Sequence, residues 1–176
     1  MTTEYLLNRE LQHVLAALTE SNALVVRVIL RTGLRVSDVL SLETKQLACR
    51  MWVIESKTKK RRQVGIGKTL LEELKNQAGD KWVFPGARDP NKHRTRQAVW
   101  RDVKRAAKAF RLPQNVGTHS VRKAYAVNLM AKYGDIKRVQ RALLHEYMTT
   151  TLIYAMADTL LEGKQKARRS RAWSHG

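Results

Sequence analysis

Apolar residues recur at helical spacing along most of this sequence, and the pattern changes most clearly between residues 49 and 67. There, CRMWVIE (49–55) and QVGIG (63–67) are rich in β-branched and aromatic residues, and the basic run SKTKKRR (56–62) joins them. Two extended runs with a polar link between them predict a β-hairpin. We therefore expect a mainly α fold with a small antiparallel β-sheet, an α+β arrangement within one domain.

The remaining segments predict helices separated by short turns. Thr32-Gly33 is expected to end the second helix, and Ser37 or Asp38 to cap the third. Thr118 and Asp135 are the expected caps of two later helices. The expected helical ranges are 4–19, 22–31, 36–42, 68–78, 94–110, 118–133, 135–146 and 149–163, with an extended piece at 81–86.

The charge of the chain points to an anionic partner. There are 34 Lys and Arg residues against 15 Asp and Glu residues, a formal net charge of +19, which is far more than solubility requires. A generically basic protein is the alternative. The N-terminus does not resemble a signal peptide, and no apolar run approaches the ~20 residues of a membrane helix. We expect a cytoplasmic protein without membrane attachment, for which nucleic acid is the abundant polyanion. The single Cys49 excludes an internal disulfide and is expected to be a small core residue.

Three basic segments are separated along the chain, at 57–62, 88–111 and 164–171. Cations this dense repel one another, and three such segments suggest a surface that follows a phosphate backbone. For the first segment, a solvated hairpin tip remains the alternative. The second lies largely in a predicted helix whose apolar stripe is Val99, Val103, Ala106 and Phe110.

Common catalytic signatures are missing from the sequence. The histidines do not have the spacing of metal ligands, and GIGKT (65–69) lacks the upstream glycine of a phosphate-binding loop. The sequence also lacks the G-x-S-x-G motif that carries the nucleophilic serine of many hydrolases. We therefore expect neither a metal nor another cofactor. His119 and Arg122 lie three residues apart in a predicted helix and so point the same way, although such pairs are common on surfaces. Arg35 either caps the preceding helix or contributes a second arm to a phosphate clamp.

Four motifs in order resemble those of the tyrosine recombinase (phage integrase) family. They are RTGLRVSDVLSL (31–42), SKTKKRR (56–62), THSVRK (118–123) and LLH…IY (143–154), and the resemblance runs from about residue 4 to about residue 160. It implies the catalytic-domain fold of DNA breaking-rejoining enzymes over residues 1–162, followed by a basic, flexible tail at 163–176. No core-binding domain is expected ahead of it, which fits either a naturally small recombinase or an excised catalytic domain.

The resemblance also implies roles for the residues that would contact the scissile phosphate. Arg35 and Arg122 match the two catalytic arginines, which hold the non-bridging oxygens. Lys57 matches the hairpin lysine that acts as general acid toward the 5′-hydroxyl leaving group, with Lys59 as the alternative register. Asp38 matches an acidic residue that orients the site. The residues expected to bind DNA are Lys59, Lys60, Arg61, Arg62, Arg94, Arg96 and Arg101.

Three further residues complete the implied catalytic set. His119 would help to manage the nucleophile's proton, His145 would hydrogen-bond a phosphate oxygen, and Tyr154 would be the nucleophile. The family usually has glycine before the later histidine, where this chain has Leu144. The implied activity is site-specific cleavage and rejoining of double-stranded DNA through a 3′-phosphotyrosyl link, by homo-tetramers. A type IB topoisomerase and a non-catalytic DNA-binding module are the alternatives.

The nine-residue separation of His145 and Tyr154 adds a structural condition. In one unbroken helix this spacing places the two side chains on opposite faces, so they can share a site only if the chain bends between them. Thr149, Thr150 and Thr151 favour such a break, because threonine is poor inside a helix and good at its start. Tyr147 is an alternative nucleophile only if the register of this turn differs.

Overall fold

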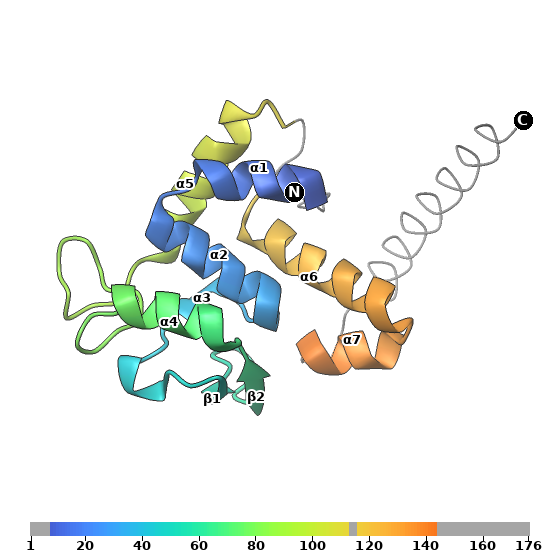
Figure 1. Ribbon diagram of the computed structural model, residues 1–176, viewed down its shortest axis with the longest axis horizontal. Coiled ribbons are helices and arrows are strands. Elements are labelled where there is room, and N and C mark those ends of the chain that lie inside the picture. The colour runs from blue at the N-terminus through green and yellow to red at the C-terminus, as the bar shows by residue number, and fades with distance from the viewer. Residues whose placement is uncertain (1–7, 113–115, 144–176) are drawn as a thin grey trace, which may run out of the picture. The chain divides into compact units, whose positions relative to one another are not determined.

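The computed structural model describes residues 8–112 and 116–143 (Figure 1). Two compact units divide the chain, one ending at Tyr125 and the other beginning at Ala126. The elements are α1 Asn8–Ala17, α2 Glu20–Thr32, α3 Val36–Leu40, the short 3-10 turn η1 Thr44–Gln46, β1 Arg50–Ile54, β2 Arg61–Gly65, α4 Lys68–Gln77, α5 Arg96–Ala109, α6 Thr118–Tyr133 and α7 Ile136–Leu143. This order confirms the mainly helical fold with one small antiparallel sheet.

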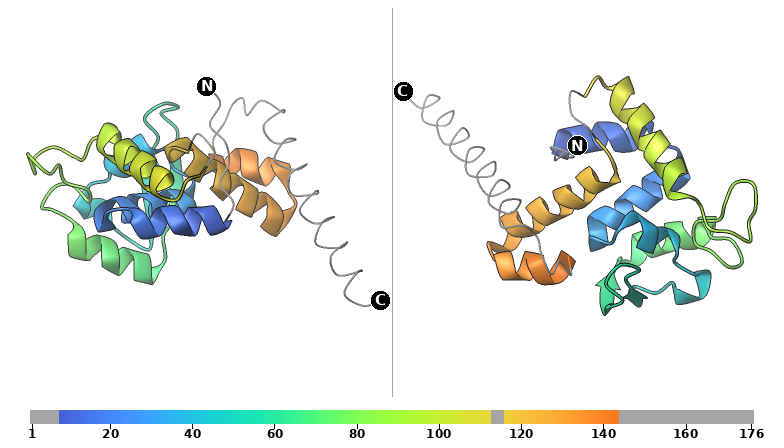
Figure 2. Two further views of the ribbon diagram at one scale, coloured as in Figure 1. Left: turned by 90° about the horizontal axis from the view of Figure 1, so that it is seen from above. Right: turned by 180° about the vertical axis from the view of Figure 1, so that it is seen from behind.

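Helix α2 is the centre of the first unit. It contacts α1 and α5 on one side and α4 and β2 on another, as Figures 1 and 2 show. Its sequence explains this position, because Val25, Val26, Val28 and Ile29 are all fully buried. A helix that is apolar on most of its circumference has to be surrounded by other elements. The same core includes the apolar positions of α5 and the inward-facing residues of the hairpin.

The two strands form the predicted hairpin, with Arg50 opposite Gly65 and Ile54 opposite Arg61. Met51 and Val53 face the core, whereas Trp52 and Ile54 are half or more exposed, as a period of two requires. β2 begins at Arg61 rather than at residue 63, so the ladder takes in two cations assigned above to the link. The expectation that Cys49 is a core residue is wrong, because Cys49 precedes β1 and is exposed.

The connection from α2 to α3 brings the first motif into position. Gly33 ends α2 in the left-handed conformation, with φ of 68°, and its N–H donates to the Ile29 carbonyl. This confirms the predicted stop. The prediction that Ser37 or Asp38 caps the next helix is wrong: both lie inside α3, and the capping position is Arg35. The start of α3 therefore carries Arg35, whose side chain is 14% exposed, and the first turn buries the Asp38 side chain.

A buried carboxylate fastens α5 to the junction of α1 and α2. Asp102 Oδ2 accepts hydrogen bonds from Thr19 N, Thr19 Oγ1 and Asn22 Nδ2 at 2.7–3.0 Å, and Oδ1 accepts from Arg105. Although burial opposes ionisation, these donors lower the pKa of Asp102 to about 2. On the same helix, Phe110 was expected in the apolar stripe, but it is 41% exposed and stacks on His13.

The second unit contains the end of α6 and all of α7. Gly134, with φ of 65°, ends α6 as predicted. Asp135 Oδ1 accepts hydrogen bonds from Lys137 N and Arg138 N, which confirms the predicted cap of α7. Thr118, the other predicted cap, is instead the first residue of α6. None of the described helices is long and apolar enough to cross a membrane.

Gly33→Ala is expected to destabilise the fold by about 2–4 kcal/mol. A left-handed alanine is strained, and its Cβ would stand 2.4 Å from Cε1 of the Tyr125 ring. Urea unfolding followed by circular dichroism measures the loss. Gly65→Ala is the matched control, because its Cβ would meet only the Cys49 carbonyl at 3.7 Å, an ordinary contact. Equal stability of the two variants would contradict this account of the α2–α3 turn.

Candidate active site

The first part of the candidate site is an ion-pair cluster in which Glu55 joins two arginines. Arg35 Nη1 donates a hydrogen bond to Glu55 Oε2. Arg62 Nε lies 3.4 Å from Glu55 Oε1, and Arg62 Nη2 donates to the Thr32 carbonyl at 2.9 Å. The cation at the C-terminal end of α2 is therefore Arg62 rather than Arg35. The cluster ties the hairpin to the turn that carries Arg35.

A second carboxylate holds the other side of the hairpin turn. Asp38 is almost completely buried, and its Oδ1 accepts hydrogen bonds from Ser56 N at 3.0 Å and Ser56 Oγ at 2.6 Å. Ser56 immediately precedes Lys57, so Asp38 fixes the backbone next to the predicted general acid. Asp38 Oδ2 is buried and has no hydrogen-bond partner in the part of the chain that the structure describes.

Arg122, from the first half of α6, completes the cluster. It is only 6% exposed. Burial lowers the pKa of Arg122 to about 10, and the charge of Arg35 acts in the same direction, whereas Glu55 and Asp38 oppose the change. At neutral pH the guanidinium therefore stays charged. Because charge interactions of this kind need proximity, the structure brings together the two arginines that the sequence predicted.

The cluster holds more positive than negative charge. Arg35, Arg62 and Arg122 contribute three guanidinium groups, and Asp38 and Glu55 contribute two carboxylates. A buried set of charges with an excess of one sign is costly unless an ion of the other sign is bound. Arginine binds the oxygens of phosphate in a bidentate way, which makes a phosphate group the natural counter-ion.

His119 lies one turn before Arg122 on α6 and remains accessible to solvent. Partial burial of the ring lowers the pKa of His119 below its usual 6.5, and the charges of Arg122 and Arg35 lower it further. The imidazole is therefore neutral at pH 7. A neutral imidazole can accept a proton, which a histidinium ion cannot do.

Lys57 and most of the predicted DNA-binding cations lie on exposed surface. Lys57, Lys59 and Lys60 are in the hairpin turn, where Lys59 has a positive φ of 56° and donates its N–H to the Glu55 carbonyl. Arg61 is also exposed, with its guanidinium 4.5 Å from the centre of the Trp52 ring. The turn thus presents its cations outward, directly beside the buried cluster.

The other predicted DNA-binding residues divide into two groups. Arg96 and Arg101 are exposed on α5, and the charge of Arg96 reaches His119. By contrast, the Arg62 side chain is 12% exposed and engaged as described, and Arg94 Nη1 donates to Asn22 Oδ1 at 2.9 Å. Burial lowers the pKa of both arginines. DNA contact by Arg62 and Arg94 stays a prediction, although both guanidinium groups already donate hydrogen bonds within the protein.

Part of the predicted catalytic set lies outside the described residues. This holds for His145, Tyr147, Tyr154, the predicted break at 149–151 and the predicted flexible tail. Sequence reasoning also missed one prominent member of the cluster, Glu55. The only signal for it was an acidic residue at the end of a strand, beside a basic run, and such residues are usually solvated.

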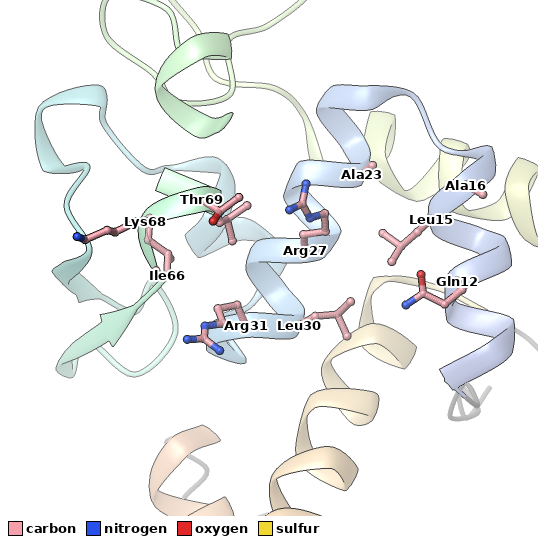
Figure 3. A pocket seen from close by; sticks show the side chains of 12 residues that line it. Gln12, Leu15, Ala16, Ala23, Arg27, Leu30, Arg31, Ile66, Lys68 and Thr69 are labelled. Carbon is pink, nitrogen blue, oxygen red and sulfur yellow. The ribbon is translucent and has the colours of Figure 1, made fainter. Parts of the chain in front are cut away.

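A pocket of about 820 Å³ lies elsewhere in the first unit, between α1, α2 and the start of α4. Figure 3 shows Gln12 and Leu15 from α1, Arg27 and Arg31 from α2, and Lys68 at the start of α4. None of the predicted catalytic residues lines it. No residue of the arginine cluster lines it either, so this pocket is separate from the cluster.

Comparison with known proteins shows the family of this chain. The family model of the phage integrase family matches residues 4–160. The probable integrase/recombinase YoeC of Bacillus subtilis (strain 168) is 31% identical over 135 residues, which are 73% of this chain and 74% of that protein. The chain belongs to the phage integrase family.

Two more relatives define how far the likeness extends. Tyrosine recombinase XerD of Listeria monocytogenes serotype 4b (strain F2365) is 31% identical over 148 residues, covering 77% of this chain. The match spans only 50% of XerD, so the chain corresponds to about half of that relative. The crystal structure of XerH site-specific recombinase in a pre-cleavage complex with its difH substrate has a TM-score of 0.69 and 24% identity. The matched region covers 85% of this chain and 50% of the XerH chain. This likeness confirms the predicted recombinase fold.

Proposed function

We propose that this chain cleaves and rejoins DNA strands at a specific site through a covalent 3′-phosphotyrosyl intermediate. The observation that carries the proposal is the pair Arg35 and Arg122, with largely buried side chains in a cluster of excess positive charge. Site-specific recombination is favoured over the topoisomerase and the non-catalytic alternatives, because the relatives are named integrases and recombinases. The catalytic region of the proposal is residues 1–162.

In the proposed reaction the two arginines hold the non-bridging oxygens of the scissile phosphate. Tyr154 Oη attacks the phosphorus, a bond to the 5′-oxygen breaks, and the phosphate becomes linked to tyrosine. A tyrosine hydroxyl has an ordinary pKa of about 10 and is a weak nucleophile at pH 7. His119, neutral at pH 7 because its pKa is lowered, is the proposed acceptor of the tyrosine proton. Lys57 donates a proton to the leaving 5′-oxygen.

The energy of the original phosphodiester is kept in the phosphotyrosyl link. A 5′-hydroxyl from another strand can attack that link, which restores the tyrosine and joins the strands. The proposal therefore requires no ATP. The positive field of the cluster stabilises the charge that develops on the phosphate oxygens during both steps. His145 is proposed to donate a further hydrogen bond to one of these oxygens.

The partner in this proposal is double-stranded DNA, and the active assembly is a homo-tetramer on DNA in the cytoplasm, associated with the nucleoid. The XerH relative was crystallised with its DNA substrate, and this chain has exposed cations on the hairpin and on α5. Analytical ultracentrifugation with and without the target duplex tests the tetramer. A protein that stays monomeric on its cleavable duplex would contradict it.

The direct test of the activity is covalent capture from a pool of randomised duplexes. The protein is incubated with the pool, the reaction is stopped with detergent, and DNA that remains attached after denaturing washes is sequenced. The proposal predicts an enriched sequence that is attached through a 3′-phosphate. Attachment without sequence preference would instead favour the topoisomerase alternative. No attached DNA, with retained binding, would favour the non-catalytic module.

DNA binding is expected to weaken steeply with salt, since each phosphate contact contributes about −0.9 to the slope of log K against log salt. The double variant Lys59→Ala/Lys60→Ala should make the slope shallower by up to about 2. Fluorescence anisotropy at several salt concentrations measures it. Lys45→Ala/Lys75→Ala is the control, because both lysines are exposed and lie outside the three basic segments. Equal slopes for the two double variants would contradict a DNA-facing hairpin turn.

A further inference from the structure

Glu55 is the most deeply buried ionisable side chain of the candidate site, with an exposed fraction of 0%. A carboxylate is almost never fully buried unless it is paired, because removing its charge from water is costly. Its backbone is held as well: the Glu55 N–H donates to the Lys60 carbonyl at 3.1 Å, and the Glu55 carbonyl accepts from Lys59 N at 2.9 Å. The carboxylate is thus fixed at the base of the hairpin turn.

The two oxygens of this carboxylate serve different arginines. Oε2 accepts the hydrogen bond from Arg35, and Oε1 faces Arg62 Nε. Arg62 is in turn tied to the Thr32 carbonyl of α2. Within the described part of the chain, Glu55 is the one hydrogen-bond partner of the Arg35 side chain. The direction of the Arg35 guanidinium therefore depends on Glu55, and Glu55 is anchored through Arg62 to the end of α2.

Glu55 also offsets the repulsion within the cluster. The charge of Arg35 lowers the pKa of Arg122, whereas the charge of Glu55 raises it. Without Glu55, the cluster would lose one of its two carboxylates, and Arg35 would gain by turning toward solvent. A phosphate clamp works only if both arginines already point to the place where the phosphate binds, since a displacement of about 1 Å can cost 10²-fold in rate.

We propose that Glu55 is a positioning residue for strand cleavage, which holds Arg35 in the orientation that receives the scissile phosphate. This rests on the proposed function. Glu55 touches no reacting atom, and it acts through Arg35. Its carboxylate leaves four of the five guanidinium N–H donors of Arg35 for other partners. Arg35 is thus already oriented for phosphate binding before DNA binds.

The test is single-turnover cleavage of the duplex recovered by covalent capture, nicked so that the cleaved strand is lost. Glu55→Gln keeps the shape of the side chain and removes its charge. We expect a cleavage rate lower by about 10- to 100-fold and an affinity for the duplex within about twofold. Glu73→Gln is the matched control, because it removes a carboxylate paired with Arg27, away from the cluster. This control should keep the wild-type rate.

A comparison in a second background separates positioning from mere stabilisation. If Glu55 acts through Arg35, adding Glu55→Gln to Arg35→Lys should cost much less than it does in the wild type, because coupled residues are not additive. Equal costs in the two backgrounds, or a Glu55→Gln rate within twofold of wild type, would overturn the proposal. If the wild type and Glu73→Gln also fail to cleave, the proposed function has failed instead.

A measurement on the wild-type protein covers the case in which Glu55→Gln does not fold. In DNA-free protein labelled with nitrogen-15 arginine, the Arg35 side chain, assigned with Arg35→Lys, should give separate guanidinium N–H signals. Separate signals show slow rotation, as expected for a group held by a buried carboxylate. Averaged signals like those of the exposed Arg101 would overturn the proposal independently of any cleavage assay.

Discussion

Arg122→Ala is expected to lower the single-turnover cleavage rate by about 10²- to 10³-fold or more. Arg122 is buried in the cluster and stays charged at neutral pH although burial lowers its pKa to about 10. Its loss removes a donor that is already in place for the charge that develops on the phosphate. The measurement is quenched-flow cleavage of the captured duplex.

Two further variants make this prediction specific. Arg122→Lys keeps a positive charge but not the planar fork, so its rate should fall between those of the wild type and Arg122→Ala. Arg27→Ala removes an arginine that pairs with Glu73 outside the cluster, and it should cleave as the wild type does. Circular dichroism checks that each variant is folded. A folded Arg122→Ala protein with the wild-type rate would exclude Arg122 from the phosphate clamp.

Tyr154→Phe is expected to abolish covalent attachment to DNA while leaving DNA affinity unchanged. Phenylalanine keeps the ring and removes the only atom that the proposed attack requires. Denaturing gel electrophoresis of the nicked duplex with protein detects the attached species, and anisotropy measures the affinity. Tyr154 lies outside the described residues, so this prediction depends on the motif alone and is independent of the geometry of the arginine cluster.

Two other tyrosines serve as controls for this experiment. Tyr147 is the alternative that the sequence leaves open, and Tyr147→Phe should still become attached to DNA. Tyr125 is half-buried on α6, and its ring lies against Gly33, in the turn that leads to Arg35. Tyr125→Phe should also become attached. Loss of attachment in either control, with attachment retained in Tyr154→Phe, would reassign the nucleophile.

The sequence was sufficient to predict most of the described elements because these depend on local patterns, whereas the roles of Arg35 and Arg122 were implied by the family resemblance. Gly33 stops α2 by adopting a left-handed conformation, and Asp135 caps α7 through its own carboxylate. The hairpin followed from the change of periodicity near residue 49. Each of these features is decided within a few residues of chain, where spacing and residue type carry the information.

The partners of the charged residues could not be predicted, because they come from distant parts of the chain. Arg35 meets Glu55 across 20 positions of sequence, and Arg94 meets Asn22 across 72. In the sequence, Arg62 looks like one more cation in a basic run, but its place in β2 turns it inward to Glu55 and Thr32. Whether a cation faces DNA or the protein is thus a property of the tertiary structure.

The central claim is that one tyrosine of this chain becomes linked to DNA, within a site built on Arg35 and Arg122. The most direct measurement is mass spectrometry of the trapped protein–DNA adduct after digestion with nuclease and protease. The account predicts a peptide that contains Tyr154 with a nucleotide attached through its 3′-phosphate. A nucleotide on Tyr147, on Tyr125 or on a non-tyrosine residue, or a 5′-phosphate linkage, would contradict it.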